Sequence, residues 1–252
     1  MKVFYMRRRW LTIIAGLLII AAIFYVASVP AVLSTAASSR QLPIYSVETG
    51  EEKLVAISFD AAWGNEDTQH LIDIMDKYGI KATFFVVGSW VDKYPESVKA
   101  LSDAGHDVMN HSDTHPHMPQ LSSEEIISEI QTCNDKVAGV TGVSPTLIRL
   151  PYGDYDDKTI SAVRSIGMEP IQWDVDSLDW KDLSADEITQ RVLSGVKPGS
   201  IVLFHNAALH TPEALPGIID SLQKDGYTFV KIADLIADGD YTIDHTGRQF
   251  SA

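Results

Sequence analysis

Val55-Ala56-Ile57-Ser58-Phe59-Asp60 opens the pattern that decides the fold, a mostly apolar run that ends at a carboxylate. From Lys53 onward, such runs alternate with segments of helical periodicity. We predict strands over 54–59, 83–87, 107–109, 146–150, 170–173, 201–204 and 228–230, and helices over 67–78, 95–104, 123–137, 157–165, 186–193 and 212–223. This alternation predicts parallel strands in a barrel-like or doubly wound α/β fold.

Polar side chains follow the predicted strands, and these are Asp60, His111, Arg149, the pair Asp174 and Asp176, and His205. In α/β barrels the reactive groups gather at the carboxyl ends of the strands. Taken singly, each residue has an ordinary alternative, such as an aspartate that begins a turn or a histidine hydrogen-bonded in the structure. Their shared placement favours one active site.

Two histidines in His111-Ser112-Asp113-Thr114-His115 are four residues apart, so on one helical turn both rings could bind one ion. Neutral imidazoles suit zinc and other divalent transition metals. His117 could add to the site or lie exposed in a loop. Histidine-rich loops often bind nothing, so the spacing alone leaves the metal open.

The charge is uneven along the 252 residues. Residues 1–40 hold five basic and no acidic residues, which leaves 15 basic against 34 acidic residues and a formal charge of −19 in the remainder. Such an acidic body repels a phosphate backbone, so we expect no nucleic-acid partner. The single cysteine, Cys133, excludes an intrachain disulfide.

The N-terminus predicts a membrane anchor. Residues 10–33 are almost wholly apolar and follow Arg7-Arg8-Arg9, which predicts a transmembrane helix with a cytoplasmic N-terminus. A cleaved signal peptide is the alternative, because small residues follow the run. We therefore expect a single-pass membrane protein with an extracytoplasmic domain, divided into a basic segment (1–9), an anchor (10–33), a linker (34–50), a catalytic domain (51–238) and a tail (239–252).

Five motifs follow one another along the chain, and these are Ser58-Phe59-Asp60-Ala61, His111-Ser112-Asp113-Thr114-His115-Pro116, Arg149-Leu150-Pro151-Tyr152-Gly153, Asp176-Ser177-Leu178-Asp179-Trp180 and Leu203-Phe204-His205. In this order, within a region from about Lys53 to Leu235, they resemble the polysaccharide deacetylase family (NodB homology, carbohydrate esterase family 4). The segment from Phe59 to Asn65 is most similar to the sporulation-associated subgroup of this family. The resemblance implies a distorted (β/α)7 barrel after the transmembrane helix. It also implies a metal-dependent hydrolase of carbon–nitrogen bonds, which removes acetyl groups from peptidoglycan or a related N-acetylglucosamine polymer.

The resemblance also implies roles for individual residues. Asp60 is expected as general base and His205 as general acid, oriented by an acid of the fourth motif, among which we select Asp176. Arg149 is expected to hold Asp60, and the backbone N–H of Tyr152 to bind the oxyanion. The expected metal ligands, with zinc as the expected ion, are His111 and His115. The expected substrate-binding residues are Trp63, Tyr152, Trp180 and Leu203.

One position departs from the family pattern. Its second aspartate, which is normally the third protein ligand of the metal, is Ala61 here. Catalytic zinc generally has three protein ligands, so we expect weak metal binding unless Asp60, Glu66, Asp67 or Asp113 substitutes. The alternative function is therefore a catalytically weak or inactive relative that binds cell-wall glycan or a wall-assembly partner.

Overall fold

The computed structural model describes residues 10, 13, 17–19 and 40–252. Residues 1–9 and most of the predicted anchor at 10–33 lie outside the described residues. Among the residues that are described, no helix is long and apolar enough to span a membrane. Gln41–Ala252 forms one compact unit.

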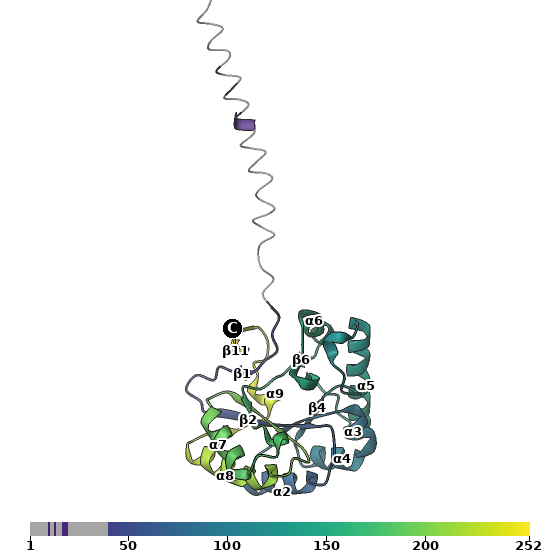
Figure 1. Ribbon diagram of the computed structural model, residues 1–252, viewed down its shortest axis with the longest axis vertical. Coiled ribbons are helices and arrows are strands. Elements are labelled where there is room, and N and C mark those ends of the chain that lie inside the picture. Colours follow the sequence, from purple (N-terminus) through teal and green to yellow (C-terminus); the bar gives the residue numbers. More distant parts are fainter. Residues whose placement is uncertain (1–9, 11–12, 14–16, 20–39) are drawn as a thin grey trace, which may run out of the picture. The chain divides into compact units, whose positions relative to one another are not determined.

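Parallel strands form the centre of this unit (Figure 1). Pairing runs from β8 through β2, β3, β4 and β5 to β6, and β7 pairs with β8. The segment that precedes β1 (Ser46–Val47) extends the sheet beside β6, because Ile44 pairs with Ile171. The strands are β2 (Leu54–Ala61), β3 (Thr83–Val86), β4 (Asp107–Asn110), β5 (Leu147–Ile148), β6 (Glu169–Pro170), β7 (Val175–Asp176) and β8 (Ser200–His205). The predicted α/β fold of parallel strands is confirmed.

Helices follow the strands and surround them (Figure 1). They are α2 (Thr68–Tyr78), α3 (Gly88–Lys93), α4 (Pro95–Asp103), α5 (Ser123–Thr141), α6 (Asp157–Ser165), α7 (Ala185–Gly195), α8 (Thr211–Lys224) and α9 (Ile232–Leu235). Short 3-10 turns are η1 (Met118–Gln120), η2 (Pro151–Gly153) and η3 (Asp179–Lys181). Two helices begin with capping boxes, at Ser122 for α5 and at Ser184 for α7, which satisfy the first free backbone amides.

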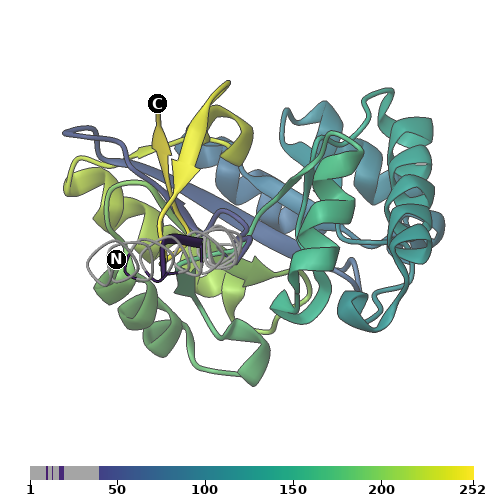
Figure 2. The same cartoon turned by 90° about the horizontal axis from the view of Figure 1, so that it is seen from above.

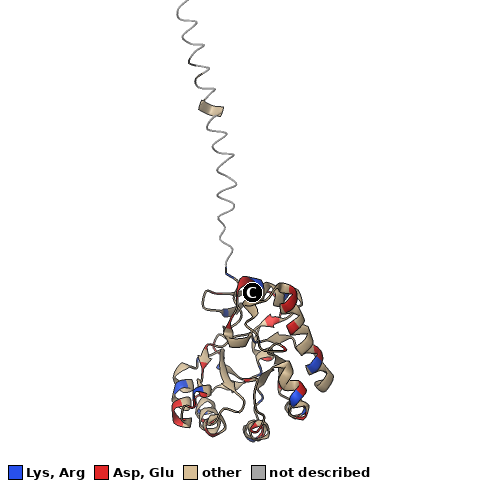
Figure 3. Cartoon of the chain, turned by 45° about the vertical axis from the view of Figure 1, so that its right-hand side comes forward, with Lys and Arg blue, Asp and Glu red and all other residues tan. Residues whose placement is uncertain are grey.

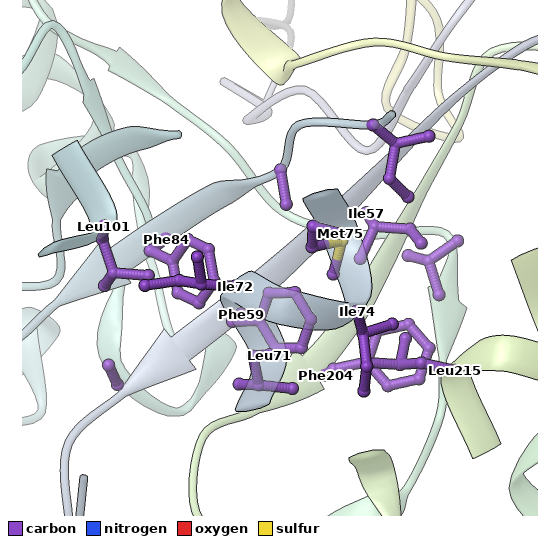
Figure 4. Close-up of a cluster of buried hydrophobic side chains, with 14 of the residues drawn as sticks. Ile57, Phe59, Leu71, Ile72, Ile74, Met75, Phe84, Leu101, Phe204 and Leu215 are labelled. Carbon is purple, nitrogen blue, oxygen red and sulfur yellow. The ribbon is translucent and has the colours of Figure 1, made fainter. Parts of the chain in front are cut away.

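Alternation along the strands separates two buried layers. In β2, Val55, Ile57 and Phe59 belong to the outer cluster between strands and helices, whereas Ala56 belongs to the inner one. Figure 4 shows the outer cluster, in which the ring of Phe59 stacks on those of Phe84 and Phe204 at 4.7 and 5.6 Å between centroids. Successive strand residues point to opposite faces, so Asp60 faces inward and Ala61 packs outward in the outer cluster.

The ends of the unit differ from the predicted domain boundaries. We expected a linker over 34–50 and a tail over 239–252, but β1 (Ser46–Val47) pairs with both β8 and β11 (Arg248–Ser251). β10 (Tyr241–Ile243) completes this edge, where Figure 2 shows the C-terminal strands together. β9 (Thr228–Phe229) pairs with β2. β1, β10 and β11 are therefore part of the sheet, because their backbone groups find partners there.

Charged residues are spread over the outer helices (Figure 3). Pairs such as Lys99–Asp103 and Lys81–Asp76 have side chains that are more than one-third exposed. Exposed pairs of this kind contribute little to stability. The electrostatics that matter for the fold are therefore those of the buried charges near the strand ends.

Gly199 provides a test of the contact between β1 and β8. Its φ is +81°, and a Cβ there would overlap the carbonyl oxygen of Val47. Gly199→Ala should lower the free energy of unfolding by about 3–5 kcal/mol, from backbone strain and overpacking together, measured by chemical denaturation. Gly217→Ala in α8, where a Cβ meets nothing within 4 Å, is the control and should raise stability by about 0.5–1 kcal/mol. Equal stabilities of the two variants would contradict the assigned register.

Candidate active site

A pocket of about 380 Å³ opens at the carboxyl ends of the strands. It is large enough for a small ligand. Its lining contains most of the site residues predicted from the sequence, together with Gly153 and Trp173, to which no role had been assigned. The full lining is Asp60, Trp63, His111, His115, Tyr152, Gly153, Trp173, Asp176, Trp180, Leu203 and His205. Arg149 lies outside this lining and is completely buried.

Asp60 and Arg149 form a buried ion pair. Nη1 of Arg149 donates to Oδ1 of Asp60 at 2.9 Å, and Nη2 donates to the carbonyl of Gln172 at 3.1 Å. The guanidinium also lies over the ring of Phe85, 4.3 Å from its centroid. Burial alone would raise the pKa of the Asp60 carboxyl, but its interactions with the His111 ring and the Arg149 guanidinium outweigh burial and hold this pKa below its ordinary value. Asp60 is therefore a carboxylate at neutral pH.

His111 is buried with one ring nitrogen directed at Asp60. Its Nδ1 lies 2.7 Å from the carbonyl oxygen of Arg149, which can only accept, so Nδ1 carries the proton. Nε2 then holds the lone pair, 3.5 Å from Oδ2 of Asp60. Burial lowers the pKa of His111 and favours this neutral form. A backbone carbonyl that fixes the tautomer in this way is typical of a histidine prepared to bind a metal.

The predicted helical turn between His111 and His115 is wrong. The segment is a loop in which Ser112 and His115 have φ of 66° and 61°. Glu129 of α5 holds it, because its carboxylate accepts from the backbone N–H groups of Asp113 and Thr114 at 3.0 and 2.8 Å. The loop nevertheless brings the two imidazole rings together, with centroids 4.9 Å apart.

His115 connects the histidine pair to the rim of the pocket. Burial, and then the neighbouring His111, lower the pKa of His115 to about 4, so the ring is neutral at neutral pH. The rings of His115 and Tyr152 pack edge to face with centroids 4.5 Å apart, and the ring of His117 stacks on that of Tyr152 with centroids 4.1 Å apart. His117 therefore supports Tyr152, and its Nδ1 lies 3.2 Å from Asp154 on the exposed side.

The acid that contacts His205 is Asp179, where the sequence led us to select Asp176. Oδ1 of Asp179 lies 2.8 Å from Nδ1 of His205, and Oδ2 accepts from the backbone N–H of His205 at 2.8 Å. Asp176 lines the pocket, but its Oδ1 accepts from the backbone of Leu178. Asp174 points elsewhere, to Ser200. Burial would lower the pKa of His205, but the hydrogen bond to Asp179 and the charge of Asp60 raise it above its ordinary value.

The residues present do not complete the metal site that the resemblance implies. His111 and His115 offer two nitrogens, but within the part of the chain that is described no three His, Cys, Asp or Glu side chains form a group that could hold an ion. The carboxylates considered as substitutes are engaged elsewhere. Asp113 pairs with Lys136 at 2.6 Å, Oδ2 of Asp67 accepts from Ala207, and Glu66 accepts from Asn65. Asp60 is already paired with Arg149.

Comparison with known proteins gives consistent matches. The family model described as Polysaccharide deacetylase matches residues 47–171. The peptidoglycan-N-acetylmuramic acid deacetylase PdaA of Bacillus subtilis is 31% identical over 190 residues, which cover 74% of this chain and 72% of that protein. PdaC, an enzyme of the same description from that organism, is 34% identical over 194 residues, covering 77% of this chain. The chain spans only 41% of the length of PdaC.

Solved structures include a CE4 family pseudoenzyme from Bacillus anthracis, which is 36% identical with a TM-score of 0.73, covering 77% of this chain and 68% of that one. A mutant of that pseudoenzyme is described as having restored enzymatic activity, and it matches with 37% identity and the same TM-score. Similarity of this chain therefore extends both to deacetylases and to a protein described as a pseudoenzyme.

Ala61→Asp tests whether position 61 limits metal binding. Ala61 is fully buried among apolar side chains, so a carboxylate there should lower the free energy of unfolding by about 3–5 kcal/mol without metal. Zinc should draw the new carboxylate out of the apolar layer toward His111 and His115, recover that loss, and bind more tightly than to the unsubstituted protein, measured by thermal unfolding and calorimetric titration. Ala61→Asn, equal in size but uncharged, is the control. Sub-micromolar 1:1 zinc binding by the unsubstituted protein, lost in His111→Ala, would show instead that position 61 is not limiting.

Proposed function

The chain belongs to the polysaccharide deacetylase family, and on this basis we propose that it removes acetyl groups from an N-acetylated cell-wall glycan, peptidoglycan or a related N-acetylglucosamine polymer. The observation that supports this function is the retention of two proton-transfer groups, each with its own buried partner. Asp60 is paired with Arg149, and His205 with Asp179. Both partners are at most 1% exposed. Burying such charges is costly, and a surface that only bound sugar would not need them.

Deacetylation requires one proton to be removed and another to be supplied. In this proposal the Asp60 carboxylate accepts a proton from the attacking water, whose oxygen adds to the acetamide carbonyl carbon. The backbone N–H of Tyr152 donates to the oxyanion that forms. As the carbon–nitrogen bond breaks, Nε2 of the His205 imidazolium gives its proton to the departing amine, and acetate and the free amino sugar result. The raised pKa of His205 keeps more of the ring protonated at neutral pH.

A second candidate function is glycan binding without hydrolysis. Ala61 and the incomplete ligand set favour it, as does the similarity to the CE4 family pseudoenzyme. Three half-exposed aromatic side chains, Trp63, Tyr152 and Trp180, offer sugar-stacking surfaces that remain useful when turnover is lost.

Two measurements on chitin and peptidoglycan oligomers test the two candidate functions. One is acetate release with and without added zinc, and the other is calorimetric titration of oligomer binding. Hydrolysis by the unsubstituted protein should fall about 10²–10⁴-fold in Asp60→Asn, because the general base is lost. Asp103→Asn, at the exposed end of α4, is a control that should leave the rate unchanged.

Binding without acetate release by the unsubstituted protein, with release by Ala61→Asp, would support the second candidate and reject the first. Absence of both binding and release in all of these proteins would reject both candidates.

We also propose that the domain works outside the cytoplasm behind a retained N-terminal anchor, and that its glycan belongs to the spore wall. The apolar run at 10–33 after Arg7-Arg8-Arg9 supports the anchor, and the phrase over 59–65 supports the link to sporulation. Protease added to spheroplasts that produce the full chain should degrade the domain and spare a cytoplasmic control protein. Survival of the domain would contradict export, and a mature mass without residues 1–33 would indicate a cleaved signal peptide.

A further inference from the structure

The loop that follows β2 is fixed to the loop that follows β8. Asn206 is 2% exposed, and its Nδ2 donates to the carbonyl oxygens of Trp63 and Gly64. Nε1 of Trp90 also donates to the carbonyl of Gly64. Gly64 has φ of +55°, and a Cβ there would lie 2.7 Å from that of Ala207. The two loops therefore approach so closely that only glycine fits at position 64.

This connection places an exposed tryptophan against a buried histidine. The indole of Trp63 is 46% exposed, yet its backbone is held by the hydrogen bonds of Asn206. Its ring stacks on the imidazole of His205, with centroids 5.6 Å apart and an interplanar angle of 21°. A large apolar side chain that is held rigidly but left half exposed contributes little to the core, so its position over His205 calls for another reason.

The imidazole of His205 is then restrained in two directions. Asp179 holds its Nδ1 edge, and is itself fixed by the hydroxyl of Thr211, which donates to Oδ2 at 2.6 Å. Trp63 covers one ring face. Nε2 is the nitrogen left to meet a ligand in the pocket. The charged or titratable groups that face the ring are Asp60 on β2, Asp176 on β7, Asp179 on η3 and His111 after β4.

We propose that Trp63 is a positioning residue for His205. The indole face of Trp63 fixes the plane of the His205 imidazole and stabilises the protonated form of that ring. The attraction between a cation and the negative face of an aromatic ring acts within about 6 Å, which this stacking distance satisfies. The inference rests on the proposed function only in treating His205 as the proton donor. The competing role for Trp63 is the one expected from the sequence, direct stacking on the substrate.

The test is the pKa of His205, measured by NMR on the full chain with labelled histidine. Trp63→Leu removes the aromatic face and should lower this pKa by about 0.5 pH unit, because the imidazolium loses its stabilisation by the indole and the neutral ring is then favoured. Trp63→Phe keeps an aromatic face and should retain most of the effect. Asp179→Asn should lower the pKa further and serves as the positive reference. Trp180→Leu is the matched control, because Trp180 is a similarly exposed tryptophan of the same pocket (52%) with a cation–π contact to Lys181.

An unchanged pKa in Trp63→Leu, or an equal fall in Trp180→Leu, would overturn the proposal. Weaker binding of chitin oligomers by Trp63→Leu without a change in pKa would assign Trp63 to substrate stacking and would also overturn it. If Trp63→Leu does not fold, the His205 pKa of Trp63→Phe decides instead. A value above that of the unsubstituted protein would overturn the proposal. The titration needs no turnover, so it can succeed or fail independently of the acetate-release measurements.

Discussion

The ion pair between Arg149 and Asp60 is the interaction on which the site depends. A guanidinium with no exposed surface is costly unless an opposite charge lies beside it. Asp60 supplies the charge, the carbonyl of Gln172 takes a second N–H group, and the rings of Phe85 and Trp173 cover the faces. The candidate base thus also holds β2, β3 and β5 together around one buried cation. Chemistry and internal packing cannot be separated at this residue.

Strand alternation explains why the other site residues meet this pair. Residues two apart on a strand share a face, and parallel strands end at one edge of the sheet. Leu203 and His205 share the inner face of β8, while Val202 and Phe204 pack outward in the outer cluster. The register that pairs Asp60 with His205 then sets base and acid side by side. A one-residue shift of β2 or β8 would turn the side chain of Asp60 or of His205, respectively, into the apolar outer cluster.

Periodicity in the sequence predicts the elements that are long enough to carry it. The six predicted helices each correspond to one in the structure, whereas β7 was not predicted, because Val175 lies between Asp174 and Asp176 and belongs to no apolar run. β1 and β11 are fixed by distant partners, as Ser46 is by Ser200, so local sequence does not reveal them. The choice between Asp176 and Asp179 depended on a turn with Leu178 in a left-handed conformation (φ 54°). Residue spacing does not reveal that turn.

The missing carboxylate at position 61 changes the charge balance of the site as well as the number of ligands. His111 and His115 are neutral at neutral pH, so they contribute lone pairs but no negative charge toward a dication. The nearest carboxylate, Asp60, is already neutralised by Arg149 at 2.9 Å, and drawing it toward an ion would leave a buried guanidinium unpaired. The methyl group of Ala61 packs in the outer cluster, where an apolar side chain leaves no buried charge unpaired. The interior is therefore electrically balanced by its own residues, and the same ion pair that preserves the base works against tight metal binding.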